Sequence, residues 1–116
     1  MSADKSALAS SVAHAASGLL EIPSGGIASR VIARTPAGNV TLFAMDADQE
    51  ISEHTTPFDA LVLVLEGRLG LTIGGARIDA APHDIVRMPA HVPHALRAAA
   101  PCRFVLVMLR EPQPAL

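Results

Sequence analysis

A chain of 116 residues, half of them hydrophobic and with a formal net charge of −2, has room for one domain with one core and none for a second. Its nine basic residues are scattered, and its only aromatic residues are Phe43, Phe58 and Phe104. A nucleic-acid partner is therefore not expected, because that function needs clustered positive charge or stacking rings.

The same composition argues against a membrane partner and against an internal disulfide. No apolar stretch approaches the length that crosses a bilayer, so we expect no membrane partner. Cys102 is the only cysteine, so an internal disulfide is impossible and a cytoplasmic location fits best. We expect Cys102 to be a small buried hydrophobic residue rather than a nucleophile.

Residues 1–22 are expected to form an N-terminal helix or arm. Apolar residues recur there at roughly helical spacing, with Ser6 available as a cap and Gly18 available to end the helix, which predicts a short helix over residues 6–17. Its Ala and Ser residues supply little chemistry, so we expect it to pack on the main domain or on a partner.

Residues 23–110 are expected to form the main domain, followed by a tail at 111–116. Short apolar segments alternate with Pro and Gly turns, the pattern of an all-β sandwich or barrel. The predicted strands are 27–34, 40–45, 61–66, 69–73, 76–79, 84–88, 94–98 and 102–109.

The segment 60–66 contains almost only apolar residues, which indicates that both of its faces are covered. If Ala60 points inward, Leu61, Leu63 and Leu65 point outward and need a cover of their own. A homodimer interface is the simplest cover.

Two segments carry histidines in a recognisable setting. In 48–67, His54 is followed at fixed spacing by Gly67; in 83–98, Pro89 precedes His94. These segments resemble the paired motifs of the cupin family, of the small single-domain, RmlC-like, cupin 2 conserved-barrel type. The resemblance implies a double-stranded β-helix, a jelly-roll barrel.

The departures from the family pattern concern its glycines and its metal ligands. Asp48, His83 and His91 stand where the motifs have Gly, and Ala98 stands where the second motif has Asn. Thr56 occupies the position of the second histidine, and Ala60 that of the glutamate.

The resemblance implies a divalent metal in the lumen, held by three imidazoles and a carboxylate, of which His54 and His94 remain. Mn, Fe, Ni or Zn would suit such a site. Other groups considered as replacement ligands are Asp59, Glu53 and His91. On an ideal strand, however, Glu53 and Asp59 have the parity opposite to His54 and would face away from it. His83 and His91 are more simply explained as polar turn residues.

The predicted ligand-binding residues are His54, Thr56, Met88, His94 and Phe104, with Met88 and Phe104 near the pocket mouth; no catalytic residue is assigned. Two functions remain open. One is a binding module whose lumen holds a small molecule, with the histidines orienting a carboxylate or carbonyl and with a divalent metal as an optional addition. The other is a metal-dependent enzyme, an oxygenase or isomerase, acting on a small chelating substrate. A filled barrel acting only as a scaffold is a third hypothesis, which the histidine pair disfavours.

Overall fold

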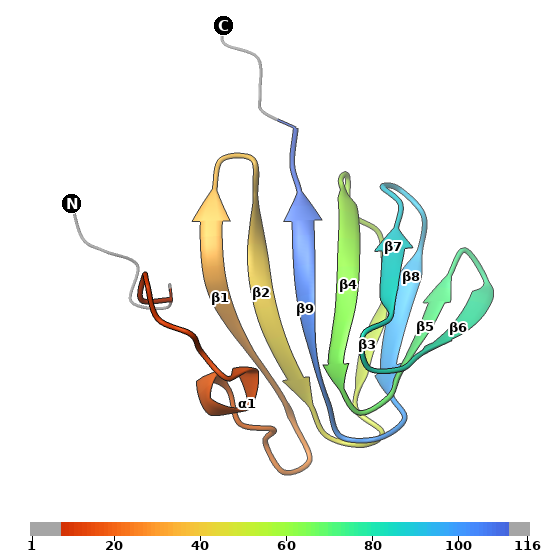
Figure 1. The fold of residues 1–116 in the computed structure, drawn as a ribbon. Helices are drawn as coiled ribbons and strands as arrows, with labels where there is room; N and C mark the ends of the chain where they lie inside the picture. The colour runs from red at the N-terminus through yellow and green to blue at the C-terminus, as the bar shows by residue number, and fades with distance from the viewer. Residues whose placement is uncertain (1–7, 112–116) are drawn as a thin grey trace, which may run out of the picture.

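The computed structural model describes residues 8–111, and in this range the chain forms two antiparallel sheets and one short helix (Figure 1). The five-stranded sheet has the order β1-β2-β9-β4-β7, and the four-stranded sheet has the order β3-β8-β5-β6. The strands are β1 (Ile27–Thr35), β2 (Gly38–Met45), β3 (Glu50–His54), β4 (Asp59–Glu66), β5 (Leu69–Ile73), β6 (Ala76–Ala80), β7 (Ile85–Met88), β8 (His94–Ala98) and β9 (Cys102–Leu109). The predicted all-β jelly roll is confirmed.

The core lies between the two sheets and follows the two-residue period of a strand. On β4, the buried residues Ala60, Val62 and Val64 alternate with half-exposed neighbours. On β9, Cys102 and Phe104 are fully buried on the same inner side. Ala60 therefore points inward, which was the condition for an outward set of leucines, and Leu61 and Leu63 lie on the outer face of the five-stranded sheet.

The predicted N-terminal helix is mostly absent. A single turn of helix, α1 (Ala16–Leu19), replaces the helix expected over 6–17, and it includes Gly18 instead of ending there. Ser11 has a positive φ of 63°, which interrupts a right-handed helix. Few apolar contacts stabilise the start of this helix, and forming the first turn of a helix is energetically costly. The expected cap, Ser6, lies outside the described residues.

The predicted strands all exist, with ends shifted by up to two residues, but β3 was not predicted. This strand lies at the edge of the four-stranded sheet, and four of its five residues are exposed. Its composition is therefore polar, without the apolar alternation that reveals a half-buried strand.

Three positions that are glycines in the cupin motifs hold other residues in a left-handed backbone. Asp48, His83 and His91 have φ values of 66°, 76° and 65°. Gly67, the glycine that the first motif retains, has a φ of 80°, and a Cβ there would lie 2.1 Å from the Pro101 oxygen. Left-handed backbone thus occurs here both at Gly67 and at three positions where the cupin motifs have glycine and this chain has another residue.

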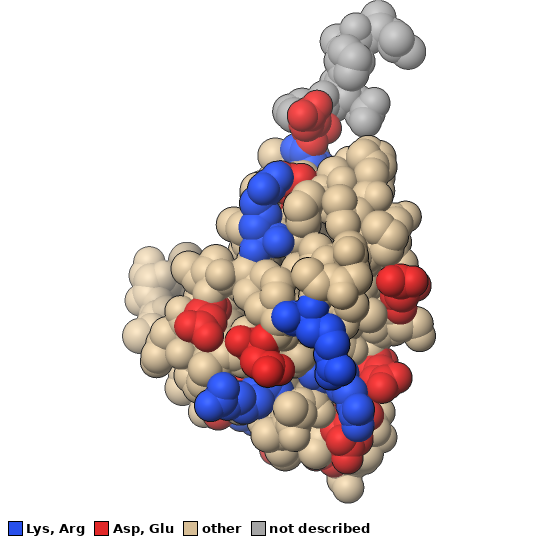
Figure 2. Space-filling model, turned by 90° about the vertical axis from the view of Figure 1, so that its right-hand side faces the viewer, with Lys and Arg blue, Asp and Glu red and all other residues tan. Residues whose placement is uncertain are grey.

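The surface carries both signs of charge in close mixture. On the side shown in Figure 2, basic and acidic side chains of the described residues are interspersed, and ion pairs such as Arg97–Asp48 join them. The helix in the described part of the chain has four residues, far too few to cross a membrane.

Candidate functional site

A small cavity of about 140 Å³ lies in the lumen between the two sheets. The structure brings all five predicted ligand-binding residues to its wall: His54, Thr56, Met88, His94 and Phe104. The remaining wall is apolar and consists of Phe43, Ile51, Ala60, Leu96, Leu106 and Met108. The polar atoms of this wall therefore come mainly from two imidazoles and one hydroxyl group.

A bulge in β3 aims His54 into this cavity. Ile51 pairs with Leu96, and His54 pairs with His94, so two residues of β3 face a single residue of β8 between these pairs. On a regular strand, Ile51 and His54 would point to opposite faces. The extra residue reverses the parity, so both line the lumen, which is a known use of bulges near functional sites.

The two histidines meet at their Nε2 atoms, which lie 3.1 Å apart. Their ring centroids are 4.3 Å apart, and the ring planes cross at 68°. His94 is 3% exposed, whereas His54 lies on the exposed edge strand. One histidine of the pair thus lies in the buried lumen and the other lies at the surface.

Backbone carbonyls determine which ring nitrogens are free. The Nδ1 atom of His54 lies 2.7 Å from the Ser52 oxygen, and that of His94 lies 3.1 Å from the Val92 oxygen. A carbonyl oxygen only accepts, so each Nδ1 donates and carries the hydrogen. In neutral rings, both Nε2 atoms then present lone pairs to each other. Such an arrangement is favourable when a proton, a metal ion or a ligand donor lies between them.

The pair fits two adjacent positions around a divalent metal. Two nitrogens bound at about 2.1 Å, with an angle of about 90–110° between them, lie roughly 3.0–3.4 Å apart, and the observed separation is 3.1 Å. The Nδ1 bonds to carbonyls are also the outer contacts that usually orient metal-binding histidines.

No third metal ligand comes from the described part of the chain, where no three His, Cys, Asp or Glu residues converge. Thr56 donates its hydroxyl hydrogen to the Phe58 oxygen at 3.0 Å, and Ala60 has no ligating atom. Any further ligands would have to be water or a bound molecule.

The replacement ligands considered from the sequence lie elsewhere. Asp59 is bound by the Ala90 amide at 2.8 Å and by Arg87 at 3.2 Å. These contacts, with the Ala90 bond as the main cause, hold the pKa of Asp59 below its ordinary value. Glu53 is exposed and lines a groove outside the lumen. Neither carboxylate therefore lines the cavity, although the bulge in β3 and the break between β3 and β4 remove the ideal strand on which the parity argument was based.

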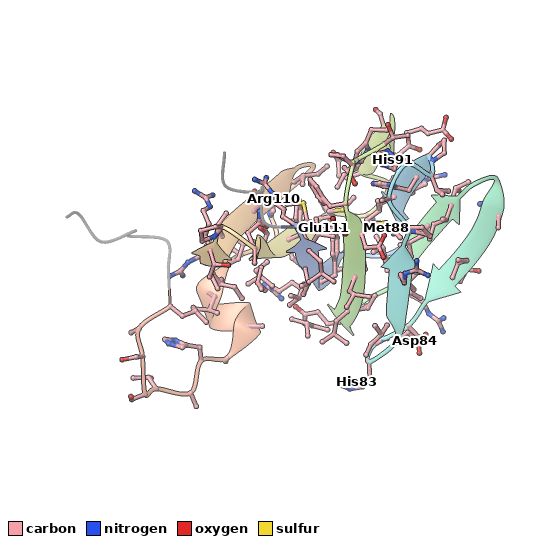
Figure 3. The ribbon with its side chains drawn as sticks, turned by 90° about the horizontal axis from the view of Figure 1, so that it is seen from above. His83, Asp84, Met88, His91, Arg110 and Glu111 are labelled. Atoms are coloured by element: carbon pink, nitrogen blue, oxygen red, sulfur yellow. The ribbon has the colours of Figure 1, made fainter. Side chains whose placement is uncertain are left out.

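His83 and His91 occupy exposed left-handed turns and do not line the cavity. They also lie on opposite sides of the fold when it is viewed from above (Figure 3). The His91 amide donates to the Thr56 oxygen at 2.8 Å, which ties the loop 89–93 to the cavity wall.

Three other predictions concern sulfur and aromatic side chains. Met88 and Phe104 line the cavity, but they are 3% and 0% exposed, so they form its inner wall rather than its mouth. Phe104 stacks on Phe43 with ring centroids 5.0 Å apart. Cys102 is fully buried, as predicted, and its burial raises its thiol pKa to about 11.

Several wall residues were not predicted from the sequence. Ile51 lies on the unpredicted strand β3, so nothing marked it as inward-facing. Leu106 and Met108 continue the inward parity of Phe104 along β9, and this alternation was a signal that could have identified them.

Comparison with solved structures shows the same fold in other proteins. A conserved protein of unknown function from Streptococcus pyogenes is 28% identical, with 90% of this chain and 91% of that chain covered and a TM-score of 0.85. A cupin superfamily protein from Desulfitobacterium hafniense is 24% identical, with coverage of 92% and 97% and a TM-score of 0.83. Salicylate 1,2-dioxygenase from Pseudoaminobacter salicylatoxidans is 17% identical, with coverage of 72% and 25% and a TM-score of 0.68.

A search of curated proteins finds no match. The family model for the cupin domain matches residues 41–108, which include strands from both sheets and both cavity histidines. The chain therefore belongs to the cupin domain family.

Proposed function

We propose that this chain binds a small, mostly apolar molecule in the lumen and holds its polar group at the Nε2 atoms of His54 and His94. The observation that supports this most strongly is the composition of the cavity wall: it is apolar except for Thr56 and these two convergent imidazoles. A concave apolar site with a few converging polar groups is the usual form of a ligand pocket.

The cavity volume limits the ligand. At about 140 Å³, the cavity is close to a documented apolar cavity of about 150 Å³ that accepts benzene. A ligand of roughly six to nine non-hydrogen atoms fits this space, unless wall residues move. With both Nδ1 atoms donating to carbonyls, the Nε2 lone pairs accept hydrogen bonds, so a hydroxyl group suits the pair better than the carbonyl expected from the sequence. A carboxylate would suit the pair only with one added proton.

The test is a thermal-shift screen in the presence of a chelator, using benzene-sized molecules that carry a hydroxyl, carboxylate or amide group. We expect a stabilising hit for the parent chain and a loss of that hit in Ala60→Leu, which fills the cavity while leaving both histidines in the sequence. His83→Ala serves as the control, because His83 lies outside the cavity. Equal stabilisation of all three proteins would contradict the proposal.

A metal-dependent enzyme is the second candidate, and the 3.1 Å separation of the Nε2 atoms favours it. His54 and His94 would hold one divalent first-row ion, which would supply Lewis acidity or a dioxygen site to a chelating substrate. The chain's own residues would position that substrate, with Met88 and Phe104 packing against its apolar part.

Elemental analysis decides this second candidate. Protein incubated with Mn²⁺, Fe²⁺, Ni²⁺ or Zn²⁺ and then desalted is compared with the variant carrying both His54→Ala and His94→Ala. Near-stoichiometric metal in the parent alone would support the enzyme. Absence of metal from both proteins would exclude it and leave the binding module. A cytoplasmic location suits either function, because Cys102 is a buried free thiol.

A further inference from the structure

The polar side chains of the cavity wall present hydrogen-bond acceptors only. Both Nδ1 atoms of the histidine pair donate to backbone carbonyls, so the neutral rings of His54 and His94 present their Nε2 lone pairs. The Thr56 hydroxyl donates its hydrogen to the Phe58 oxygen at 3.0 Å, which leaves the Thr56 oxygen as an acceptor. The described residues that line the cavity include no lysine or arginine. A bound molecule therefore meets three acceptor groups and no free side-chain donor.

The three acceptor groups belong to neighbouring parts of the wall. His54 pairs with His94 across β3 and β8, and Thr56 follows His54 by two residues. The His91 amide donates to the Thr56 backbone oxygen at 2.8 Å, which brings Thr56 beside the loop that leads to His94. The rest of the wall is apolar. In a cavity of about 140 Å³, one head group can therefore contact all three acceptors while an apolar body lies against the remaining wall.

Head groups differ in the number of donors that they bring to such a site. A carboxylate or a carbonyl brings only acceptors, so its lone pairs would face those of the wall. A hydroxyl group brings one donor, and a primary amide brings two donors together with an oxygen that no donor of the wall satisfies. A primary ammonium group brings three donors and no acceptor. Of these head groups, ammonium alone matches the three acceptors in kind and in number.

We infer that the lumen selects a primary ammonium ion with a small apolar body, and that His54, His94 and Thr56 each accept one of its three hydrogen bonds. This inference rests on the proposed function, because it specifies the head group of the ligand in the lumen. Hydrogen bonds from a charged donor are roughly twice as strong as neutral ones, which offsets the cost of moving the charge out of water. His54 lies on the exposed edge strand, so the head group also stays close to the surface.

Thr56 is the residue that distinguishes an ammonium ion from a hydroxyl group. A hydroxyl group has one hydrogen, which the Nε2 atoms of the histidine pair accept, and it leaves the Thr56 oxygen without a partner. An ammonium ion bound to both Nε2 atoms still has a third hydrogen for that oxygen. Loss of the Thr56 oxygen should therefore weaken the binding of an amine and leave the binding of the corresponding alcohol almost unchanged.

Isothermal titration calorimetry with benzylamine and benzyl alcohol tests the inference, because the two molecules differ only in the head group. The protein is treated with a chelator, desalted and titrated in phosphate buffer at about pH 7.5. A primary alkyl amine keeps its proton there, as lysine does with an ordinary pKa of about 10.4. We expect the parent chain to bind benzylamine about tenfold more tightly than benzyl alcohol.

Substitutions at Thr56 separate its acceptor from its structural role. Thr56→Val, which has nearly the same shape, should lower the affinity for benzylamine about tenfold and change that for benzyl alcohol by less than about twofold. Thr56→Ser keeps the hydroxyl oxygen and should restore the affinity for benzylamine. Thr55→Val is the matched control, because Thr55 is exposed and does not line the cavity. Ala60→Leu should abolish the binding of both molecules, which separates binding in the lumen from attraction to surface carboxylates.

Three results would overturn the inference and leave a ligand site in the lumen possible. They are benzyl alcohol binding at least as tightly as benzylamine, equal weakening of both ligands by Thr56→Val, and benzylamine binding that survives Ala60→Leu. Binding of neither molecule to the parent chain would contradict the proposed function as well as the choice of head group.

Discussion

Asp48, His83 and His91 are three non-glycine residues whose backbones are left-handed. All three have left-handed backbones at positions where the cupin motifs have glycine. Asp48 also forms an ion pair with Arg97 at 2.9 Å, which gives its side chain a second role. The His83 side chain has no such contact among the described residues, so its backbone conformation is the main constraint at that position.

We predict that His83→Gly is at least as stable as the parent chain and more stable than His83→Ala. A left-handed residue with a Cβ costs about 1 kcal/mol that glycine avoids, although glycine also adds entropy to the unfolded chain. The expected difference between the two variants is about 1 kcal/mol, or roughly 4 °C in Tm. Thermal unfolding measures it, and equal Tm values for Gly and Ala would contradict the left-handed backbone at this turn.

Substitutions at Thr56 and Ala60 test whether their side chains converge with the histidine pair. Both line the cavity beside the histidine pair, where the family motif has His and Glu. We predict that the double variant Thr56→His, Ala60→Glu binds a first-row divalent metal more than about 100-fold more tightly than the parent, because four ligands replace two. Competition with a chelating dye measures this. Unchanged affinity would mean that these side chains do not converge with His54 and His94.

Individual site residues were predictable where a motif marked them. His54, Thr56 and His94 were identified from their register in the two motifs, and all three line one cavity. The bulge that turns His54 inward was not predictable, because an extra residue in an exposed polar strand leaves no mark in the pattern. Nor does the sequence reveal that both Nδ1 atoms are bound to carbonyls.

The loop 89–93 joins two cavity residues, Met88 and His94, and Asp59 fastens it to β4. One carboxylate oxygen of Asp59 accepts the Ala90 amide at 2.8 Å, and the other accepts a hydrogen bond from Arg87. The loop is also bound through the His91 amide to the Thr56 oxygen. Asp59, considered from the sequence as a metal ligand, thus has a positioning role instead.

Replacing Asp59 by Ala should loosen this loop. We predict roughly fivefold to tenfold faster hydrogen exchange at the Ala90 amide, which loses its acceptor. The matched control is Asp48→Ala, which removes an exposed ion pair elsewhere and should leave exchange at Ala90 unchanged. Unaltered exchange in Asp59→Ala would show that the loop is held by its other contacts.

The Asp59 contacts also predict a pH dependence. Because the pKa of Asp59 is lowered in the folded state, the folded state favours the carboxylate. The stabilisation is complete above the ordinary pKa of about 3.8 and is lost as the pH falls through that value and below it. Unfolding midpoints of the parent and of Asp59→Asn should therefore converge in acid. A constant difference between them at every pH would contradict this account.

Elements with apolar alternation were predictable, and those without it were not. The eight strands expected from the sequence are all present. The polar edge strand β3 was missed, and the helix expected at 6–17 is reduced to one turn at Ala16–Leu19. Both errors occur where few buried contacts exist, because there local sequence alone gives a weak signal.

At the scale of the whole molecule, β4 and β9 separate the cavity from the outer face of the five-stranded sheet. Phe104, Leu106 and Met108 of β9 face the cavity, while Val105 and Val107 face outward. The same alternation holds for Ala60 and Leu61 on β4. The runs of apolar residues at 60–65 and 104–109, evident in the sequence, thus correspond to strands with a lumen on one side and an apolar outer surface on the other.

The most direct test of the lumen as the functional site is a titration of isotope-labelled, chelator-treated protein with phenol, followed by ¹H–¹⁵N NMR. Phenol has the apolar ring that the cavity fits and one hydroxyl group for the histidine pair. We predict saturable shifts at Thr56, Ala60, Met88 and His94 in the parent chain and none in Ala60→Leu. Shifts that are absent, or that are equal in both proteins, would contradict a ligand site in the lumen.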